Sequence, residues 1–381
     1  MKITGIICEY NPLHLGHKKQ IDYIRTANGA DSGIVCLMSG NFVQRGTPAI
    51  VDKMCRAKAA VQSGADLVLE LPVTYSLSSA EGFAAGGVRI LSGFCNTLCF
   101  GAETADSEKL LTIADTLLQE DFIHILKEHL QQGVSFPAAR EAALLEMGHD
   151  AAMLKQPNNI LAVEYCKAIL AQKSSMQPMP ILRQGSYHDE LPDDENPSAT
   201  SIRTLMPGGD WERYVPKEAR PCFQNATLHT LDAGERAILM RLRTMTDDEF
   251  EALPYGSEGL WRKFMHASRK EATVEAIISA VKSKRYTRTR LDRMLMCAFL
   301  GITEKDLAQD VPYIRALAFN DRGRDILKQA RNHVPILNIG QSAEHPYVTL
   351  EIRCDDLYGL FNTANPEPPG ANSAYRVYYQ P

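Results

Sequence analysis

Short apolar runs alternate with amphipathic stretches of helix length over the first 205 residues. The apolar runs are nearly unbroken, which predicts strands that are buried on both faces of a sheet. These candidate strands are residues 3–8, 33–38, 66–71 and 97–101, with a later one at 180–183. The stretches between them predict helices near residues 15–27, 49–63, 79–92 and 106–131. This alternation predicts an α/β fold with a doubly wound parallel sheet, a Rossmann-like domain over residues 1–205.

The pattern changes after the turn-forming residues 206–209. Helical periodicity dominates residues 232–308, so we expect a second, mainly α-helical region over residues 206–381. Residues 310–381 combine a strand-like run, a further helix and a proline-rich loop. They either belong to the second region or form a separate small unit.

Length and composition indicate a soluble protein of two or three domains. The chain has 381 residues, of which 45% are apolar and 23% charged. Its apolar runs are too short for a membrane span, and the run after Lys2 is too short for a signal peptide. The nine cysteines lack the paired spacing of a zinc site, which indicates buried thiols in a reducing compartment. We expect a cytoplasmic protein without a membrane partner.

The segment after the first predicted strand, residues 9–17, carries the most specific chemistry. His14 and His17 lie three residues apart at the start of the first helix, so they face the same side. A helix N-terminus presents free N–H groups and a positive dipole end, which favour an anion such as phosphate. Gly16 allows a ligand to approach the backbone closely. Imidazoles can stabilise charge on a leaving pyrophosphate, so we predict a catalytic role for both histidines.

Other interpretations of this segment stay open on the residues alone. Either histidine can be an ordinary surface or core residue, and a pair at this spacing can bind a metal. The sequence contains neither G-x-G-x-x-G nor G-x-x-x-x-G-K-[ST], so the common glycine-rich nucleotide sites are not expected. We predict a phosphate site and no protein-bound metal.

A strand that runs into N-P-x-H-x-G-H resembles the H-x-G-H superfamily of nucleotidyltransferases, which bind ATP and react at its α-phosphate. The second signature of that superfamily, I-S-S-T-x-I-R, is similar to residues 197–203, Pro-Ser-Ala-Thr-Ser-Ile-Arg. The first and third positions differ, and a serine-capped helix start is the simpler explanation of this segment alone. Two signatures in the expected order favour the superfamily.

Longer segments narrow the resemblance to the bacterial tRNA(Met) cytidine acetate ligase family. They are residues 9–12, 38–46, 65–72, 157–165, 187–189 and 282–287. The resemblance implies an enzyme that joins acetate to ATP and releases pyrophosphate. The acetyl group of acetyl-adenylate then passes to the exocyclic amine of the wobble cytidine in elongator tRNA(Met). ATP, acetate and this tRNA are the implied partners, and we expect Mg²⁺ to accompany ATP.

The resemblance also implies which residues contact ATP: a segment at residues 7–20, then a glycine, an asparagine and an arginine-containing pair. We take the asparagine to be Asn159 rather than Asn158. Arginine and threonine side chains are expected to hold phosphates, and Gly101 to admit the nucleotide. Besides the two histidines, the predicted ATP-binding residues are Ile7, Cys8, Glu9, Tyr10, Asn11, Pro12, Leu13, Leu15, Gly16, Lys18, Lys19, Gln20, Gly101, Asn159, Arg183, Gln184, Thr200 and Arg203. An acidic run at 189–195 is interpreted as a solvated loop rather than a magnesium site.

Residues 262–293 form a basic strip of ten positive and three negative residues, a net charge of +7. The whole chain carries −5, which argues against binding nucleic acid by bulk charge but leaves room for a local basic face. A solvated helical face is the simpler explanation from composition, whereas the resemblance favours RNA binding. The predicted tRNA-binding residues are Arg262, Lys263, Arg269, Lys270, Lys282, Lys284, Arg285, Tyr286, Arg288 and Arg290, with Tyr286 placed to stack on a base.

Two other functions remain open from the sequence. An H-x-G-H adenylyltransferase acting on a small cofactor precursor would explain the first half and leave the basic strip unexplained. A nucleotide-sensing RNA-binding protein without catalysis would explain both halves without a reaction.

Overall fold

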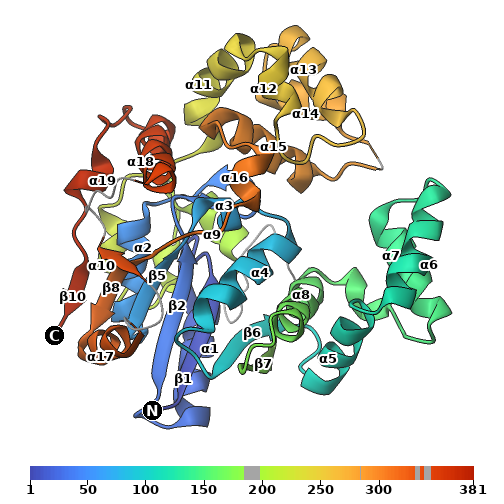
Figure 1. The fold of residues 1–381 in the computed structure, drawn as a ribbon. Coiled ribbons are helices and arrows are strands. Elements are labelled where there is room, and N and C mark those ends of the chain that lie inside the picture. Colours follow the sequence, from blue (N-terminus) through green and yellow to red (C-terminus); the bar gives the residue numbers. More distant parts are fainter. Residues whose placement is uncertain (184–197, 284, 331–334, 339–344) are drawn as a thin grey trace.

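Strands from both halves of the chain form one mainly parallel sheet with helices on both faces (Figure 1). The computed structural model describes residues 1–183, 198–283, 285–330, 335–338 and 345–381. Within these ranges the strand order is β10-β8-β5-β2-β1-β6-β7, and β9 pairs with β8. The strands are β1 (Ile3–Cys8), β2 (Gly33–Ser39), β5 (Leu67–Leu71), β6 (Thr97–Ala102), β7 (Gln177–Leu182), β8 (Ile314–Asn320), β9 (Ile336–Asn338) and β10 (Tyr378–Gln380).

The five strands predicted in the first half all form, and they are parallel to one another. The strand order reverses at β1, with β2 and β5 on one side and β6 and β7 on the other. In a doubly wound sheet, this reversal leaves a crevice at the carboxyl ends of the strands, where ligands bind. The predicted α/β fold is therefore confirmed.

Alternate side chains of the strands enter two apolar cores, one on each face of the sheet. Ile34, Cys36 and Met38 of β2 face one core, while Val35 and Leu37 face the other. The first core lies under α1 (Leu15–Asn28), α2 (Lys53–Gln62), α9 (Ala199–Leu205) and α10 (Arg220–Gln224). The second lies under α4 (Ala80–Leu91), α5 (Ser107–Thr116), α8 (Pro157–Ala171) and α17 (Asp321–Ala330).

The single helix expected near residues 106–131 is two helices, α5 and α6 (Glu120–Gln131). Asp106 caps the first helix, and a short turn separates it from the second. The second helix pairs with α7 (Phe136–Glu146) and extends away from the sheet (Figure 1).

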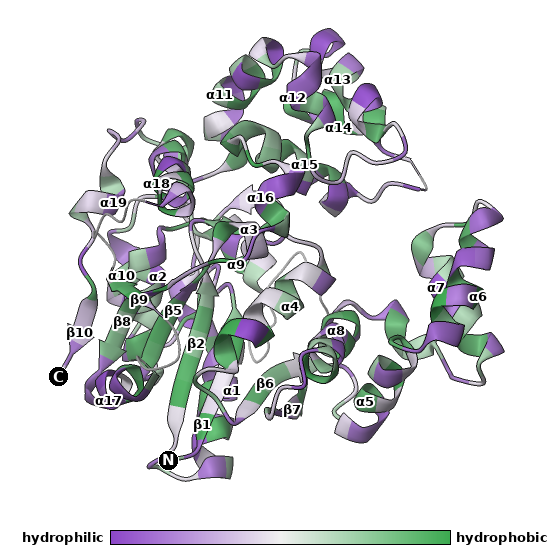
Figure 2. Ribbon diagram, in the orientation of Figure 1, coloured by the Kyte–Doolittle hydropathy of each residue, from purple (hydrophilic) through white to green (hydrophobic). Residues whose placement is uncertain are grey.

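A third apolar core lies within a bundle of helices above the carboxyl ends of the strands (Figure 1). Its central side chains, such as Phe264, Ile277 and Leu295, are buried and alternate with polar outer positions (Figure 2). The bundle consists of α11 (Leu231–Thr244), α12 (Asp247–Glu251), α13 (Leu260–Lys270), α14 (Val274–Val281), α15 (Arg288–Leu300) and α16 (Glu304–Ala308). The mainly helical character expected after residue 206 is present here.

The last 70 residues return to the sheet, which differs from the division expected at residue 206. β8 pairs antiparallel with β5, and β10 pairs parallel with β8. Leu317 and Ala318 of β8 are fully buried in the sheet core. Without β8, the backbone N–H and C=O groups along one side of β5 would lack ladder partners. Strands β8, β9 and β10 therefore belong to the same sheet as the strands of the first half.

A buried ion cluster joins this returning segment to the first domain. Lys53 at the start of α2 is fully buried, and its Nζ lies 2.6 Å from Glu70 of β5. The same ammonium lies 2.7 Å from Asp355 of α18 (Pro346–Tyr358). Asp355 also accepts hydrogen bonds from Asn41 and Asn372. Two carboxylates around one buried ammonium hold α18 against the sheet.

The nine cysteines are all free, and seven of them are buried, as their apolar surroundings predict. Within the ranges that the structure describes, the helices are too short or too polar to traverse a lipid bilayer.

Candidate functional site

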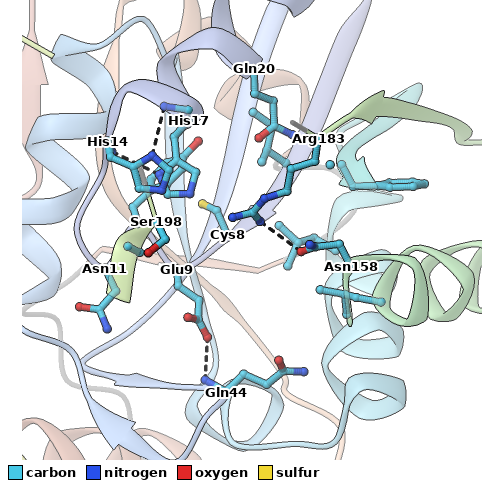
Figure 3. A pocket seen from close by; sticks show the side chains of 18 of the residues that line it. Cys8, Glu9, Asn11, His14, His17, Gln20, Gln44, Asn158, Arg183 and Ser198 are labelled. Carbon is cyan, nitrogen blue, oxygen red and sulfur yellow. Dashed lines mark hydrogen bonds between the residues drawn. The ribbon is translucent and has the colours of Figure 1, made fainter. Parts of the chain in front are cut away.

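A cavity of about 480 Å³ opens at the carboxyl ends of β1 and β6, where the strand order reverses (Figure 3). This volume lies within the range of small-molecule sites. Its walls come from β1, α1, β6, α8, β7, α9 and the hairpin of β3 (Phe42–Val43) and β4 (Thr47–Pro48). The predicted site residues that line it are Ile7, Cys8, Glu9, Tyr10, Asn11, His14, Gly16, His17, Lys19, Gln20, Gly101, Arg183, Thr200 and Arg203.

His14 and His17 form a reciprocal cap at the start of α1. Nδ1 of His14 accepts a hydrogen bond from the backbone N–H of Gly16, with a distance of 3.1 Å. Nδ1 of His17 accepts one from the backbone N–H of His14, with a distance of 3.3 Å. A neutral imidazole whose Nδ1 is an acceptor carries its proton on Nε2. Both rings can therefore donate from Nε2 to a bound anion.

The two imidazoles are neutral at physiological pH. Burial and, to a smaller extent, the positive charge of Arg183 lower the pKa of His17 to about 3. Burial and the neighbouring His17, Arg183 and Arg203 hold the pKa of His14 well below its usual value. The ring centroids lie 3.7 Å apart, so two positive charges at this distance would repel each other. These rings act as neutral hydrogen-bond donors rather than as cations.

Two arginines supply the positive charge that the histidines lack. Arg203 donates to the backbone carbonyl of Asn11 over 2.7 Å, and to the Thr200 hydroxyl over 3.0 Å. These bonds fix the start of α9 beside the start of α1. On the opposite wall, Arg183 donates to Oδ1 of Asn158 over 3.1 Å (Figure 3).

Asn158 lines the cavity, whereas the predicted contact Asn159 is fully buried behind it. Oδ1 of Asn159 accepts from the backbone N–H of Thr104 over 2.9 Å, and its Nδ2 donates to the Thr104 hydroxyl. The Glu103 carboxylate in turn accepts from the backbone N–H groups of both asparagines. Since helix geometry turns successive side chains by about 100°, only one of the pair can face the cavity. Asn158 therefore lines the cavity, while Asn159 holds the loop after β6.

Gly101 keeps the cavity open at the end of β6. A methyl group built on its Cα would meet no atom within 4 Å, because it would point into the cavity. Any side chain at residue 101 would therefore occupy open space at the cavity wall.

Several predicted residues lie outside the cavity wall. Pro12 and Leu13 are buried behind it, and Leu15 and Lys18 lie on other faces of the first turn of α1. Gln184 and the acidic run at 189–195 lie outside the described residues.

The cavity also contains residues that were not singled out from the sequence. Gln44 and Arg45 belong to a segment that supported the family resemblance, but their side chains had no predicted role. The further lining residues are Ile6, Tyr23, Val43, Thr47, Phe83, Phe100, Leu161, Tyr165, Ile181, Leu182, Ser198 and Ala199. Ser198 and Ala199 lie in the second signature at residues 197–203, and Val43, Leu161 and Tyr165 lie in segments that supported the family resemblance. Most of the others are apolar residues, and an apolar residue in the sequence does not distinguish a cavity wall from a core.

The basic strip covers one side of the helical bundle, from α13 to the start of α15. The exposed side chains are Arg262, Lys263, Arg269, Lys270, Lys282 and Arg285, while Tyr286, Arg288, Arg290 and Arg293 are half-buried. Three of these arginines form ion pairs: Arg269 with Asp247, Arg285 with Glu258, and Arg288 with Glu275 and Asp292. The net charge of the strip's surface is therefore smaller than its own composition suggests. Lys284 lies outside the described residues.

Carboxylates and thiols do not gather into a metal-binding group of three or more within the described ranges. The donors that line the cavity suit a polyanionic ligand instead. Histidine N–H groups, two arginines and two helix N-termini converge from three sides.

Comparison with known proteins gives a consistent result over the full chain. Residues 1–372 match the model of the family HIGH Nucleotidyl Transferase. The chain is 38% identical to the tRNA(Met) cytidine acetate ligase of Clostridium novyi (strain NT) over 390 residues, covering 95% of this chain and 96% of the relative. It is 36% identical to that of Anoxybacillus flavithermus over 406 residues, covering 100% and 99%.

Solved structures of Thermotoga maritima TmcAL share the fold. The apo form superposes with a TM-score of 0.90 at 28% identity, covering 100% of this chain and 99% of that one. The complex with alpha-thio ATP superposes with a TM-score of 0.88 at the same identity and coverage.

Proposed function

The chain belongs to the tRNA(Met) cytidine acetate ligases of the HIGH nucleotidyl transferase family, and from this membership and the cavity we propose how it uses ATP, acetate and tRNA. It is an ATP-dependent ligase. It activates acetate as acetyl-adenylate with release of pyrophosphate, and it transfers the acetyl group to the wobble cytidine of elongator tRNA(Met). The observation that supports the proposal most strongly is the pair of capped, neutral histidines between two arginines.

In the first step, the acetate oxygen attacks the α-phosphate of ATP and the bond to pyrophosphate breaks. Acetate is itself the nucleophile, so no side-chain nucleophile is required. The Nε2 protons of His14 and His17 point toward the anion, and their hydrogen bonds strengthen as negative charge moves onto pyrophosphate. Arg203 and Arg183, together with the helix N-termini, hold the phosphates in place.

Mg²⁺ would enter as the magnesium complex of ATP, as part of the substrate. Mg²⁺ in nucleotide sites is held largely by phosphate oxygens and water. Glu9 is the one acidic side chain among the described residues that line the cavity, which is too few for an all-protein magnesium site.

In the second step, the cytidine amine must reach the acetyl carbon inside the cavity. The helical bundle that carries the basic strip lies above the carboxyl ends of the strands, on the side where the cavity opens (Figure 1). The exposed lysines and arginines of α13, together with Lys282 and Arg285 in the segment after α14, would bind the RNA phosphates. This arrangement brings RNA binding and ATP binding to the same end of the sheet, and a tRNA substrate implies a cytoplasmic enzyme.

Pyrophosphate exchange into ATP tests the proposal against its alternatives. The proposed enzyme catalyses exchange that requires acetate and does not require tRNA. Exchange that depends on a cofactor precursor instead would indicate an adenylyltransferase for small molecules. ATP binding without any exchange would indicate a nucleotide-sensing RNA-binding protein.

The RNA step has its own test. Purified enzyme with ATP and acetate should form N4-acetylcytidine at the wobble position of elongator tRNA(Met) transcripts. Mass spectrometry of the digested tRNA measures the product, and a transcript with uridine at the wobble position is the matched control. Absence of acetylcytidine despite acetate-dependent exchange would refute the acceptor and leave the adenylation step intact.

A further inference from the structure

The tip of the β3–β4 hairpin, residues Gln44, Arg45 and Gly46, has no role in the adenylation step described above. The hairpin is rigidly held at its base, because the Phe42 ring packs edge-on against Tyr358 and Phe361 at centroid distances of 5.9 and 6.0 Å. Gly46 closes the turn with a backbone hydrogen bond to Val43 over 2.9 Å, and its φ of +77° is in the left-handed region that favours glycine. The tip is therefore presented in one conformation.

One side of the hairpin tip borders the cavity. Gln44 and Arg45 both line it, and the backbone N–H of Gln44 donates to Oε1 of Glu9 over 2.8 Å. In Figure 3, the Glu9 side chain extends from the end of β1 toward Gln44 and away from the two histidines. The second carboxylate oxygen of Glu9 has no hydrogen-bond partner within the described part of the chain. An acidic group thus faces the cavity at the end opposite the histidines.

The other side of the hairpin tip packs against the end of the basic strip. A methyl group on Gly46 would lie 2.4 Å from the backbone nitrogen of Arg293, so the two backbones are in direct contact. Nη1 of Arg293 also donates to the carbonyl of Gln44 over 3.4 Å. The end of the basic strip therefore adjoins the hairpin tip that borders the cavity.

The charge of Glu9 decides which ligand group suits this end of the cavity. A carboxylate repels phosphates, and the triphosphate has better partners in His14, His17 and Arg203. An exocyclic amine, in contrast, is a hydrogen-bond donor, and carboxylates accept well from the N4 amine of cytosine. The amine must also lose a proton when its nitrogen bonds to the acetyl carbon.

We propose that Glu9, Gln44 and Arg45 form the acceptor subsite, where Glu9 takes the proton from the cytidine amine and Arg45 binds the phosphate of that nucleotide. The proposal rests on the proposed function, because it concerns its second step. The amine nitrogen bonds to the acetyl carbon, and the bond from that carbon to the AMP oxygen breaks. AMP leaves with the electron pair, and the amine proton passes to the Glu9 carboxylate and then to solvent. Gln44 holds the carboxylate in place through its backbone N–H.

The Glu9→Gln variant tests the carboxylate. A glutamine keeps the shape and still accepts from the Gln44 N–H, but it cannot take a proton. Two rates are measured: acetate-dependent pyrophosphate exchange, and single-turnover transfer from preformed acetyl-adenylate to tRNA. Transfer should fall relative to exchange by on the order of 10²-fold, the scale of a lost general base. Equal losses in both rates would overturn the proposal, as would an increased Mg²⁺ requirement for exchange, which would make Glu9 a metal ligand.

The Arg45→Ala variant tests the phosphate contact. We expect a higher Kd for tRNA and a salt dependence of binding shallower by about one unit in the log–log slope. Arg45→Lys should restore the slope, because a lysine keeps the charge. Lys109→Ala removes an exposed lysine of α5 outside the cavity and the strip, and serves as the matched control. Unchanged tRNA binding in Arg45→Ala, with a normal urea unfolding midpoint, would overturn the phosphate contact.

These outcomes are distinct from failure of the proposed function. If the wild-type enzyme shows no acetate-dependent exchange, the function itself is wrong. If wild-type exchange and transfer are both normal and the variants behave as the control does, only the acceptor subsite is wrong.

Discussion

His17 combines a structural role with a chemical one. Its Nδ1 caps the backbone of His14, and this hydrogen bond leaves the Nε2 proton for the ligand. The same arrangement costs stability in acid, because the half-buried imidazole beside Arg183 resists protonation. Both consequences are measurable.

Replacing His17 with alanine should slow adenylation by about 10²–10³-fold, the scale for removing one charge-stabilising donor. The loss should appear in acetate-dependent pyrophosphate exchange, mainly in kcat. His124→Ala changes an exposed histidine of α6 and is the matched control. An exchange rate in His17→Ala equal to that of the control would contradict the catalytic role.

The lowered pKa of His17 also predicts a loss of stability in acid. Its pKa is about 3 in the folded protein and about 6.5 when unfolded, so the unfolded state binds the proton first as the pH falls. Stability is then retained above about pH 6.5 and declines between pH 6.5 and 3. Since pH 5 lies about 1.5 units below the usual imidazole pKa, protonation of His17 in the unfolded state lowers the free energy of unfolding by about 2 kcal/mol at pH 5.

Urea titrations of wild type and His17→Gln at pH 7 and pH 5 measure this contribution. The variant should lose less stability than wild type over this interval, because glutamine does not titrate. Identical losses in the two proteins would show that His17 is protonated in the folded state.

Among the elements, the basic strip has a surface charge that differs most from what its composition suggests. Two of its arginines, Arg269 and Arg285, form ion pairs with carboxylates that lie outside residues 262–293, Asp247 and Glu258. The exposed Arg262, Lys263 and Lys270 of α13 and Lys282 after α14 remain the better candidates for phosphate contacts.

Lys282→Ala combined with Arg262→Ala should weaken tRNA binding and make it less dependent on salt, by about two units in the log–log slope. Acetate-dependent exchange should keep the wild-type rate, because both residues lie outside the cavity. Filter binding at several salt concentrations measures the first effect. Loss of exchange together with binding would mean that the strip supports the fold rather than the RNA.

The elements also show what a sequence can predict. The central strands were predictable because unbroken apolar runs are unusual outside buried parallel strands. The β3–β4 hairpin was not, since each strand has two residues and the hairpin is held by contacts of Phe42 with residues about 300 positions away. Helix α8 lacked an amphipathic pattern because it is packed on several sides.

Some residues of the candidate site could likewise be predicted from the sequence, and others could not. His14 and His17 could be predicted as site residues because they lie at the start of the helix that follows β1, where a helix N-terminus favours an anion. The choice between Asn158 and Asn159 depends on which side chain the first turn of α8 directs into the cavity. That orientation is fixed by Glu103 in the loop after β6, which accepts hydrogen bonds from the Asn158 side chain and the Asn159 backbone N–H. Gln44 and Arg45 required the tertiary structure, because the hairpin brings them to the cavity from the end of β2.

For the whole molecule, the ion cluster around Lys53 makes the two ends of the chain interdependent. Asp355 approaches from α18, more than 300 residues after Lys53. Replacing Asp355 with alanine should lower the free energy of unfolding by about 3 kcal/mol, because it leaves a buried ammonium with one partner fewer. Asp310→Ala, which breaks the exposed pair with Arg89, should cost at most about 1 kcal/mol.

Urea denaturation of the two variants measures this difference. Equal small losses of unfolding free energy in the two variants would show that the buried cluster contributes no more to stability than a surface ion pair.

The return of the chain to the sheet has a consequence during synthesis on the ribosome. β5 emerges early, but β8, which pairs with it, follows about 240 residues later. A nascent chain therefore exposes an unpaired sheet edge until the whole helical bundle has been translated. A prematurely terminated chain would lack both β8, the partner of this edge, and α18. It would therefore be degraded by proteases and would not persist as a stable fragment that consumes ATP without tRNA.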